Sequence, residues 1–274
     1  MKKIIIAVLI IAITLVSCKK NPITGRHQVR FFPESQMIGM SATAYGDFMT
    51  ENQANVLPQT DARAAKVTEI GEKMAAAVTN YMNEIGHPEL IEGFSWQYNT
   101  VEAPTVNAWC MPGGKIVFYT GILELATTDD EIAVIMGHEI AHAVAGHGNE
   151  RMSQTAAMQG ATNVAQLALM TDSTPGLGTA ILMQSIGIGG QLGMLKFGRK
   201  HESESDEMGL IFMNKAGYDP YSAVTFWEKM KAKSEGKTPP EFMSTHPSND
   251  RRIADIQEKL IEMEAKGEII TPNK

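Results

Sequence analysis

The chain has 274 residues, of which 43% are hydrophobic and 20% are charged, and its formal net charge is −7. This length and composition indicate a folded globular protein of one large domain or two small ones. The acidic balance, without any dense cluster of lysine and arginine, excludes the basic class of nucleic-acid-binding proteins.

The first residues of the chain form a segment of a different kind. A basic start, MKK, precedes the apolar run IIIAVLIIAITLV, which is shorter than the roughly 20 residues of a transmembrane helix and typical of a secretory signal. The run ends in LVSC, which resembles a bacterial lipobox. We therefore predict a signal peptide over residues 1–17 and a lipidated Cys18, with an uncleaved signal anchor as the alternative.

Residues 18–33 are polar after the cysteine and contain proline and glycine, which predicts a tether that leads into the domain. One other cysteine, Cys110, is present, so a lipidated Cys18 leaves no partner for an internal disulfide. A single domain is predicted over residues 34–270, held by its hydrophobic core and by a metal where one binds.

Helices are predicted first, near residues 34–56 and 60–85, because apolar residues of the second stretch recur at helical steps. After them the period changes. FSWQYNT, TVNAWCM and KIVFYT read as three short strands, and MPGG supplies the turn between the last two. The sequence therefore predicts a small, about three-stranded sheet in an otherwise helical α+β fold.

The rest of the chain is predicted to be helical. TTDDE supplies the capping residues of a helix that carries IAVIMGHEIAHAVAGH, and further helices are expected near residues 200–216, 220–234 and 249–266. Residues 152–197 are rich in Met, Ala and Gly. Polar residues and glycines interrupt this segment, which favours a helical hairpin over a membrane span.

The pentapeptide HEIAH predicts a metal site. Residues four apart on a helix are offset by only about 40°, so His138 and His142 project from one face and can bind one metal. Glu139 lies beside them, where a carboxylate can hold a water and take its proton. The surrounding helix is strongly apolar, so unpartnered imidazoles would be costly there. Two satisfied core histidines are the alternative.

A zinc hydrolase normally has three protein ligands, so a third remains to be found. His147 lies about 180° around the helix from the first histidine of HEIAH, if that helix continues, and is predicted to be a helix-end residue. The stretch HESESDEM offers carboxylates. Glu202 and Asp206 share a helix face, whereas Glu204 points roughly 160° away from Glu202. Helical geometry permits either the Glu202–Asp206 pair or Glu204 alone.

HEIAH followed by ESESD resembles metallopeptidase family 48, the group of HtpX, the CAAX prenyl proteases and proteases of the BepA type. NPITGR, SATAYGDF, VNAWCMPGGKIVFYTGIL and STHPSNDRRI resemble its soluble periplasmic lipoprotein members without helical repeats. The resemblance implies a zincin-like (gluzincin) domain with one zinc ion. It implies His138, His142 and Glu202 as ligands and Glu139 as the general base.

The resemblance also assigns roles to the remaining residues of HESESDEM. It implies that Asp206 orients a ligand histidine, which leaves Glu204 and Glu207 on a solvated face and His201 as a helix-start residue. Ser205 stands where the family usually has alanine. It lies between the functional positions and changes little in this prediction.

Two further sites follow from the resemblance. Asn107 and Ala108 are expected to border the scissile bond on a strand at the lip of the cleft, where a substrate backbone can pair as an added strand. An ordinary hairpin strand is the alternative. His246 is expected to stabilise the oxyanion or to cap the metal in a resting state, and Arg252 to lie near the cleft.

We therefore expect a zinc-dependent endopeptidase of the bacterial cell envelope that cuts misfolded or unassembled envelope proteins. It is expected to face the periplasm, at the outer membrane rather than the inner, with polypeptide substrates, a lipid-mediated membrane contact and no nucleic acid as partner. The alternative is a chaperone or assembly factor whose zinc site is latent. A soluble metal carrier is a third possibility, but it would give Glu139 no purpose.

Overall fold

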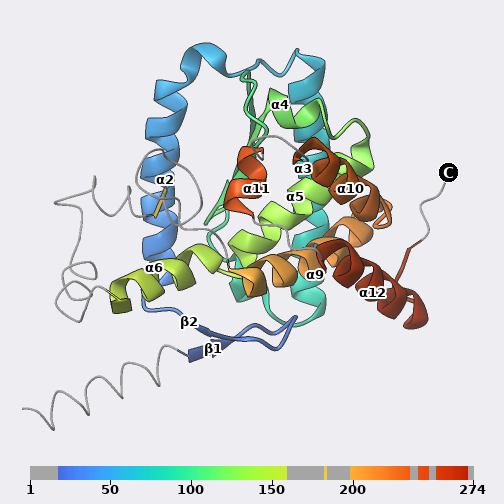
Figure 1. The fold of residues 1–274 in the computed structure, drawn as a ribbon. Helices are drawn as coiled ribbons and strands as arrows, with labels where there is room; N and C mark the ends of the chain where they lie inside the picture. The colour runs from blue at the N-terminus through green and yellow to red at the C-terminus, as the bar shows by residue number, and fades with distance from the viewer. Residues whose placement is uncertain (1–17, 159–181, 184–197, 235–239, 247–250, 271–274) are drawn as a thin grey trace, which may run out of the picture.

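The structure is a computed structural model, and it describes residues 18–158, 182–183, 198–234, 240–246 and 251–270. These parts are mainly helical with a small sheet, which confirms the predicted fold class (Figure 1). The longer helices are α2 (Glu34–Glu51), α3 (Ala62–Glu84), α5 (Asp129–Val144), α6 (His147–Met158), α9 (Arg199–Lys215), α10 (Ser222–Ser234) and α12 (Arg252–Ala265). The shorter ones are η1 (Gln53–Asn55), η2 (Pro88–Ile91), α4 (Thr120–Leu123) and α11 (Glu241–Thr245).

Two of the main helices begin at capping residues that are visible in the sequence. The Thr128 hydroxyl accepts a hydrogen bond from the backbone N–H of Glu131 at 3.2 Å, which starts α5 as TTDDE predicts. The Asp61 carboxylate accepts one from the backbone N–H of Arg63 at 2.9 Å and starts α3. These local contacts explain why the beginnings of both helices are predictable.

The sheet has the three predicted strands, β3 (Gln97–Val101), β4 (Ala108–Met111) and β5 (Lys115–Tyr119), in the order β3-β5-β4. β5 pairs parallel with β3 and antiparallel with β4. β4, the second strand in sequence, therefore lies at one edge of the sheet. This edge position matters for the site, because an edge strand carries unpaired backbone groups.

The sheet buries both of its faces. Ile116 and Phe118 belong to the core that α3 and α5 share, whereas Trp109 and Val117 face a second core beneath α2. Phe48 of α2 lies edge-on to Trp109, with 4.9 Å between the ring centroids. A strand buried on both sides explains why β4 reads as an apolar run without strict alternation.

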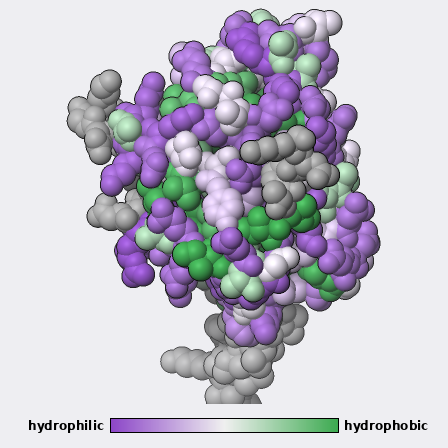
Figure 2. Space-filling view, turned by 90° about the vertical axis from the view of Figure 1, so that its right-hand side faces the viewer, coloured by the Kyte–Doolittle hydropathy of each residue, from purple (hydrophilic) through white to green (hydrophobic). Residues whose placement is uncertain are grey.

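Helix α5 is the centre of the molecule (Figure 1). Every residue from Glu131 to Val144 is buried, as expected for a helix that neighbours surround on all sides. α10 and α12 form an outer layer against α5 and α9. The face that they cover is mainly polar, with groups of apolar side chains near its middle (Figure 2). The HEIAH stretch of α5 therefore lies well inside the protein.

The N-terminal ribbon, residues 18–33, lies against the helices. Its strands β1 (Cys18–Lys20) and β2 (His27–Val29) pair antiparallel. Gln28 is buried, and its side-chain amide donates a hydrogen bond to the carbonyl of Ala145 at 2.9 Å. The segment expected to be a tether is thus packed on the domain at these contacts. The domain boundary at residue 34 and the lipidation of Cys18 stay predictions.

Two expectations concern segments that are wholly or largely outside the described residues. These are the signal peptide over residues 1–17 and the helical hairpin in residues 152–197, of which the structure describes only the end of α6 and residues 182–183. Leu182 is buried with Met152 and Ala156 in the core beneath α2. None of the described helices combines the length and apolar character needed to cross a bilayer.

α5 and α9 cross with their backbones almost in contact, and two glycines permit it. A Cβ atom on Gly137 would lie 2.8 Å from the carbonyl oxygen of Gly209, and one on Gly209 would lie 3.0 Å from the backbone nitrogen of His138. Both contacts are with backbone atoms, which cannot rotate away. The glycines therefore set the distance between the helix of HEIAH and the helix of HESESDEM.

We predict that Gly137→Ala destabilises the protein by about 1–3 kcal/mol, the usual range for overpacking a tight core. Gly46→Ala is the matched control, because Gly46 is in the interior of α2 and a Cβ there meets nothing within 4 Å. That control is expected to gain about 0.5–1 kcal/mol from helix propensity. Urea unfolding measures both. Equal stability of Gly137→Ala and the wild type would show that the helix crossing can accommodate a Cβ atom at this position.

Candidate metal centre and active site

Four buried side chains from three helical segments meet at one point. His138 and His142 come from α5, Glu202 from α9, and His246 from the C-terminal end of α11. One possible ligand atom from each lies within 4.8 Å of all the others. The three predicted ligands are therefore brought together, and His246 joins them.

The facing atoms are those that a metal would need. The Nε2 atoms of His138 and His142 are 3.0 Å apart. The two carboxylate oxygens of Glu202 lie 3.5 Å from them, one from each ring. Two imidazoles and a carboxylate are the ligand set of many catalytic zinc sites. The donor set thus fits zinc.

The surroundings of Glu139 are a second indication that the cluster is suited to hold a metal. Its Oε1 atom is buried and accepts no hydrogen bond from the described residues, although His246 Nε2 lies 3.4 Å away. Burial raises the pKa of Glu139 above its ordinary value. A buried carboxylate oxygen without a donor is costly, and a metal with its water would satisfy it.

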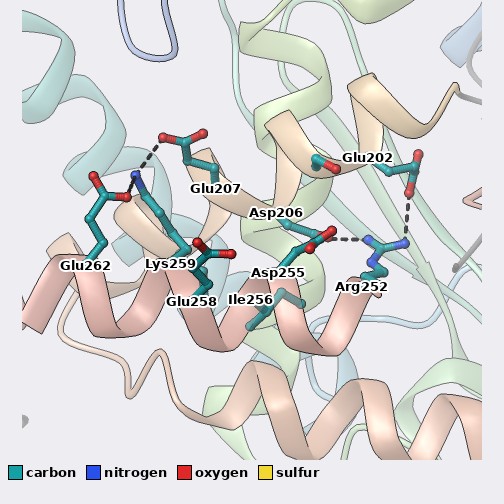
Figure 3. Close-up of a pocket in the computed structure, with 11 residues that line it drawn as sticks. Glu202, Asp206, Glu207, Arg252, Asp255, Ile256, Glu258, Lys259 and Glu262 are labelled. Carbon is teal, nitrogen blue, oxygen red and sulfur yellow. Dashed lines mark hydrogen bonds and ion pairs between the residues drawn. The ribbon is translucent and has the colours of Figure 1, made fainter. Parts of the chain in front are cut away.

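Asp206 of α9 and Arg252 of α12 contact the cluster on the side that faces α12. Asp206 Oδ1 accepts a hydrogen bond from His138 Nδ1 at 2.9 Å and one from Arg252 at 2.7 Å. The other terminal nitrogen of Arg252 donates to Glu202 at 3.0 Å, so the guanidinium bridges the two acids of α9 (Figure 3). Its plane lies over the ring of Trp227, with its central carbon 3.4 Å from the ring centroid.

Charge in this part of the site follows from those contacts. Burial by itself lowers the pKa of His138, but its hydrogen bonds to the carboxylates of Asp206 and Glu202 raise that pKa to about 9. The pKa of His142 is well below its ordinary value, because burial and the neighbouring histidines disfavour a charge there. The His142 ring is therefore neutral, with a lone pair for a metal.

The opposite side of His142 contacts a second polar cluster. Its Nδ1 atom lies 2.8 Å from Nδ1 of His147, and Nε2 of His147 lies 2.8 Å from Glu204. Burial lowers the pKa of His147 to about 4. His147 was predicted to lie at the end of the helix of HEIAH, but that helix ends at Val144 and His147 begins α6 instead. It reaches His142 because Gly146, at φ +66°, ends the previous helix and redirects the chain.

The prediction that Glu204 lies on a solvated face is wrong. Glu204 is 4% exposed, and its carboxylate accepts hydrogen bonds from Asn21 at 2.8 Å and from Thr24 and Arg26. Burial alone would raise the pKa of Glu204, but His147 above all, together with Thr24 and Arg26, lowers it to about 2. Helical spacing correctly places Glu204 away from Glu202. It cannot reveal that the N-terminal ribbon covers that side of α9.

Glu207 and His201 complete the acid-rich stretch. Glu207 is only partly exposed and pairs with Lys259 of α12 at 2.7 Å. His201 is in the first turn of α9, as predicted, but it is buried and lies 3.0 Å from Glu150. Sequence reasoning did not single out Glu150, Thr24 or Arg26. The stretch NPITGR was the available signal for the ribbon residues.

The expected substrate strand lies beside α11. Asn107 directly precedes β4, and its side-chain amide donates to Glu241 at 3.2 Å. The backbone N–H of Phe242 donates to the carbonyl of Val106 at 3.0 Å. Asn107 and Ala108 are both buried. α11 thus covers the position where a substrate backbone is expected, and it carries His246 into the ligand cluster.

Comparison with known proteins identifies the family to which the chain is similar. The sequence profile of peptidase family M48 matches residues 61–260. The mitochondrial metalloendopeptidase OMA1 of Schizosaccharomyces pombe is 32% identical over 231 residues, which cover 84% of this chain and 62% of that protein. The OMA1 of Arabidopsis thaliana is 38% identical over 162 residues, covering 59% and 31%. The beta-barrel assembly-enhancing protease of Escherichia coli is 25% identical over 251 residues, covering 82% and 50%. The chain therefore spans less than two thirds of each of these relatives.

The relatives contradict the predicted location. Six of them, including those of Saccharomyces cerevisiae and Homo sapiens, are mitochondrial by name, whereas the bacterial protease is less similar. The expectation of a bacterial cell-envelope protein that faces the periplasm at the outer membrane is wrong. A basic start with a short apolar run indicates targeting, but it does not identify the membrane concerned.

The predicted zinc cofactor is confirmed at the level of the family, since M48 metallopeptidases use zinc and the buried His-His-Glu-His cluster fits a metal. Residues 61–260 are most of the chain, and all four members of the cluster lie inside that match. The chain belongs to peptidase family M48.

Proposed function

We propose that this chain is a zinc-dependent endopeptidase in which His138, His142 and Glu202 bind one zinc ion and Glu139 is the general base. The observation that carries the proposal is the buried ligand cluster with the unsatisfied Oε1 of Glu139 beside it. A structural zinc site normally closes its coordination with four protein ligands and has no need of such a carboxylate.

The proposed chemistry divides between the metal and the protein. Held by the three proposed ligand residues, zinc would polarise the scissile carbonyl and acidify the attacking water. Oε1 of Glu139 accepts the proton of that water and passes it to the departing amine nitrogen. Asp206 keeps the proton of His138 on Nδ1, which leaves Nε2 free as a ligand atom. Arg252 holds Glu202 and Asp206 in register.

The substrate is proposed to be an extended polypeptide, as in misfolded or unassembled proteins. β4 is an edge strand, so a substrate backbone can pair with it by strand addition next to Asn107 and Ala108. This pairing uses main-chain groups, which every unfolded chain offers. The names of the relatives support peptide-bond cleavage, because they are endopeptidases and a protease.

A second candidate function is that of a chaperone or assembly factor with a capped metal site. The observation that favours it is the position of α11. His246 Nδ1 lies 3.2 Å from His138 Nε2 and 3.3 Å from Glu202, inside the ligand cluster. The same helix covers the expected substrate strand through Phe242. A chain in which this arrangement is permanent would bind polypeptides without cutting them.

We predict that Glu139→Gln keeps one zinc per chain and loses casein cleavage by at least about 100-fold, because the amide cannot accept the proton. Metal analysis and a casein digestion assay measure the two properties. Glu124→Gln, an exposed acid ahead of the same helix, is the control and should behave as the wild type. Cleavage that survives Glu139→Gln, or that persists in the wild type with a chelator, would contradict the mechanism.

Glu202→Ala is expected to lower the zinc content well below one per chain, because it removes one of three ligands. The control is Glu207→Ala on the same helix, whose carboxylate pairs with Lys259 and not with the cluster. Metal analysis after dialysis compares the variants. Full zinc in Glu202→Ala would remove that residue from the ligand set.

Glu241→Ala tests whether α11 restricts access to an active site. Loss of its hydrogen bond with Asn107 weakens the closed position by about 1 kcal/mol, so we expect cleavage to rise about fivefold at unchanged zinc content. The variant leaves the side chain of His246 unchanged, so it tests access to the site separately from the chemistry of that histidine. No increase in cleavage would mean that α11 does not limit the reaction.

A further inference from the structure

A cluster of buried polar residues lies behind the proposed metal centre, on the far side of His142. We call it the His147 cluster, and its members are Arg26, His147, Glu150, His201 and Glu204. His147, Glu150, His201 and Glu204 are each less than a tenth exposed. Burying this many ionisable groups is costly unless they pair and carry out a task. None of them is part of the mechanism proposed above.

The first contact in the cluster determines how His142 is held. Its Nε2 atom faces His138 and Glu202, so this atom is the one available to a metal. In a neutral imidazole the proton is then on Nδ1. That N–H points at Nδ1 of His147, 2.8 Å away, which must accept it. His147 therefore fixes both the ring orientation and the tautomer of His142.

The second contact determines the tautomer of His147 in turn. With Nδ1 as acceptor, His147 carries its proton on Nε2 and donates it to Glu204 at 2.8 Å. The Ser205 hydroxyl also lies near Nδ1, at the longer distance of 3.2 Å. The ring protons of His142 and His147 then point in one direction, from His142 through His147 to the carboxylate of Glu204.

The N-terminal ribbon fixes the outer end of this series. Arg26 donates to Glu204 through Nε and to both oxygens of Glu150 through its terminal nitrogens, at 2.9 and 2.7 Å. Glu150 also pairs with His201, whose ring stacks on that of His147 with 4.4 Å between centroids. Arg26 thus joins Glu204, which accepts from His147, to Glu150, which pairs with the stacked His201 ring.

We propose that His147 is a positioning residue for the metal ligand His142, that Glu204 orients His147, and that Arg26 couples the N-terminal ribbon to the metal centre. This inference rests on the proposed role of His142 as a ligand. It gives the two ligand histidines separate supports. His138 is held by Asp206, and His142 by His147 and Glu204.

The matched pair His147→Leu and His147→Asn tests the first step. The two side chains have nearly the same shape, but asparagine places an oxygen where Nδ1 of His147 stands and can accept the proton of His142. We expect His147→Leu to bind zinc about 10–100-fold more weakly in a chelator competition, the usual effect of losing such a partner. We expect His147→Asn to recover most of that loss. The d–d absorption spectrum of the cobalt-substituted protein should shift in the leucine variant and return towards the wild type in the asparagine variant.

Two isosteric changes on α9 test the second step. Glu204→Gln should weaken zinc binding and shift the cobalt spectrum in the same direction as His147→Leu. Glu207→Gln is the control, one helix turn away, and should match the wild type. Arg26→Met tests the ribbon and should also weaken zinc binding. Thermal unfolding of the metal-free proteins separates a loss of fold from a loss of metal affinity.

The outcomes distinguish this inference from the proposed function. Equal zinc affinity and cobalt spectra in the wild type, His147→Leu and Glu204→Gln would overturn the positioning role while leaving the metal site intact. Equal losses in His147→Leu and His147→Asn, with lower unfolding temperatures in both metal-free variants, would make His147 merely structural. A wild-type chain that binds no zinc would overturn both proposals.

Discussion

The close crossing of α5 and α9 is the constraint on which the rest of the molecule depends. Gly137 and Gly209 let the two backbones touch, with no side chain between them. His138 directly follows Gly137, and His142 lies one turn further along α5. On α9, Glu202 and Asp206 face these histidines. A wider crossing would leave a carboxylate too far from the imidazoles to share one ion.

The same closeness creates an electrostatic problem, since acids and imidazoles are buried together in an apolar interior. The protein solves it by bringing arginines from distant parts of the chain. Arg252 from α12 pairs with Glu202 and Asp206, and Arg26 from the N-terminal ribbon pairs with Glu150 and Glu204. Buried carboxylates stay ionised when such partners are present. The two ends of the chain therefore hold the site from opposite sides.

The position of α11 has consequences for how substrate enters. It contacts Val106 and Asn107, directly ahead of β4, and it carries His246 among the possible ligand atoms. The proposed strand addition next to Asn107 would require these contacts to break. Access to the proposed active site is thus linked to the five-residue helix α11, whereas the three proposed ligands lie on the longer helices α5 and α9.

Much of the fold was predictable because its signals are local. Capping residues mark the starts of α3 and α5, and turn residues separate β4 from β5. The pairing of His138 with His142 also follows from helical spacing alone. Helical spacing left the choice between Glu202 and Glu204 open, and the family resemblance favoured Glu202. The structure places Glu202 beside His138 and His142.

What the sequence by itself determined was therefore each helix face and the chemistry that it carries. Only the tertiary structure decided what covers each face, because that depends on segments far away along the chain. Glu204 illustrates the difference: the spacing placed it away from Glu202, but Asn21, Thr24 and Arg26 made that side buried. His147 is a second case. Gly146, which has a positive φ, follows the end of α5, and the redirected chain brings His147, the first residue of α6, against His142.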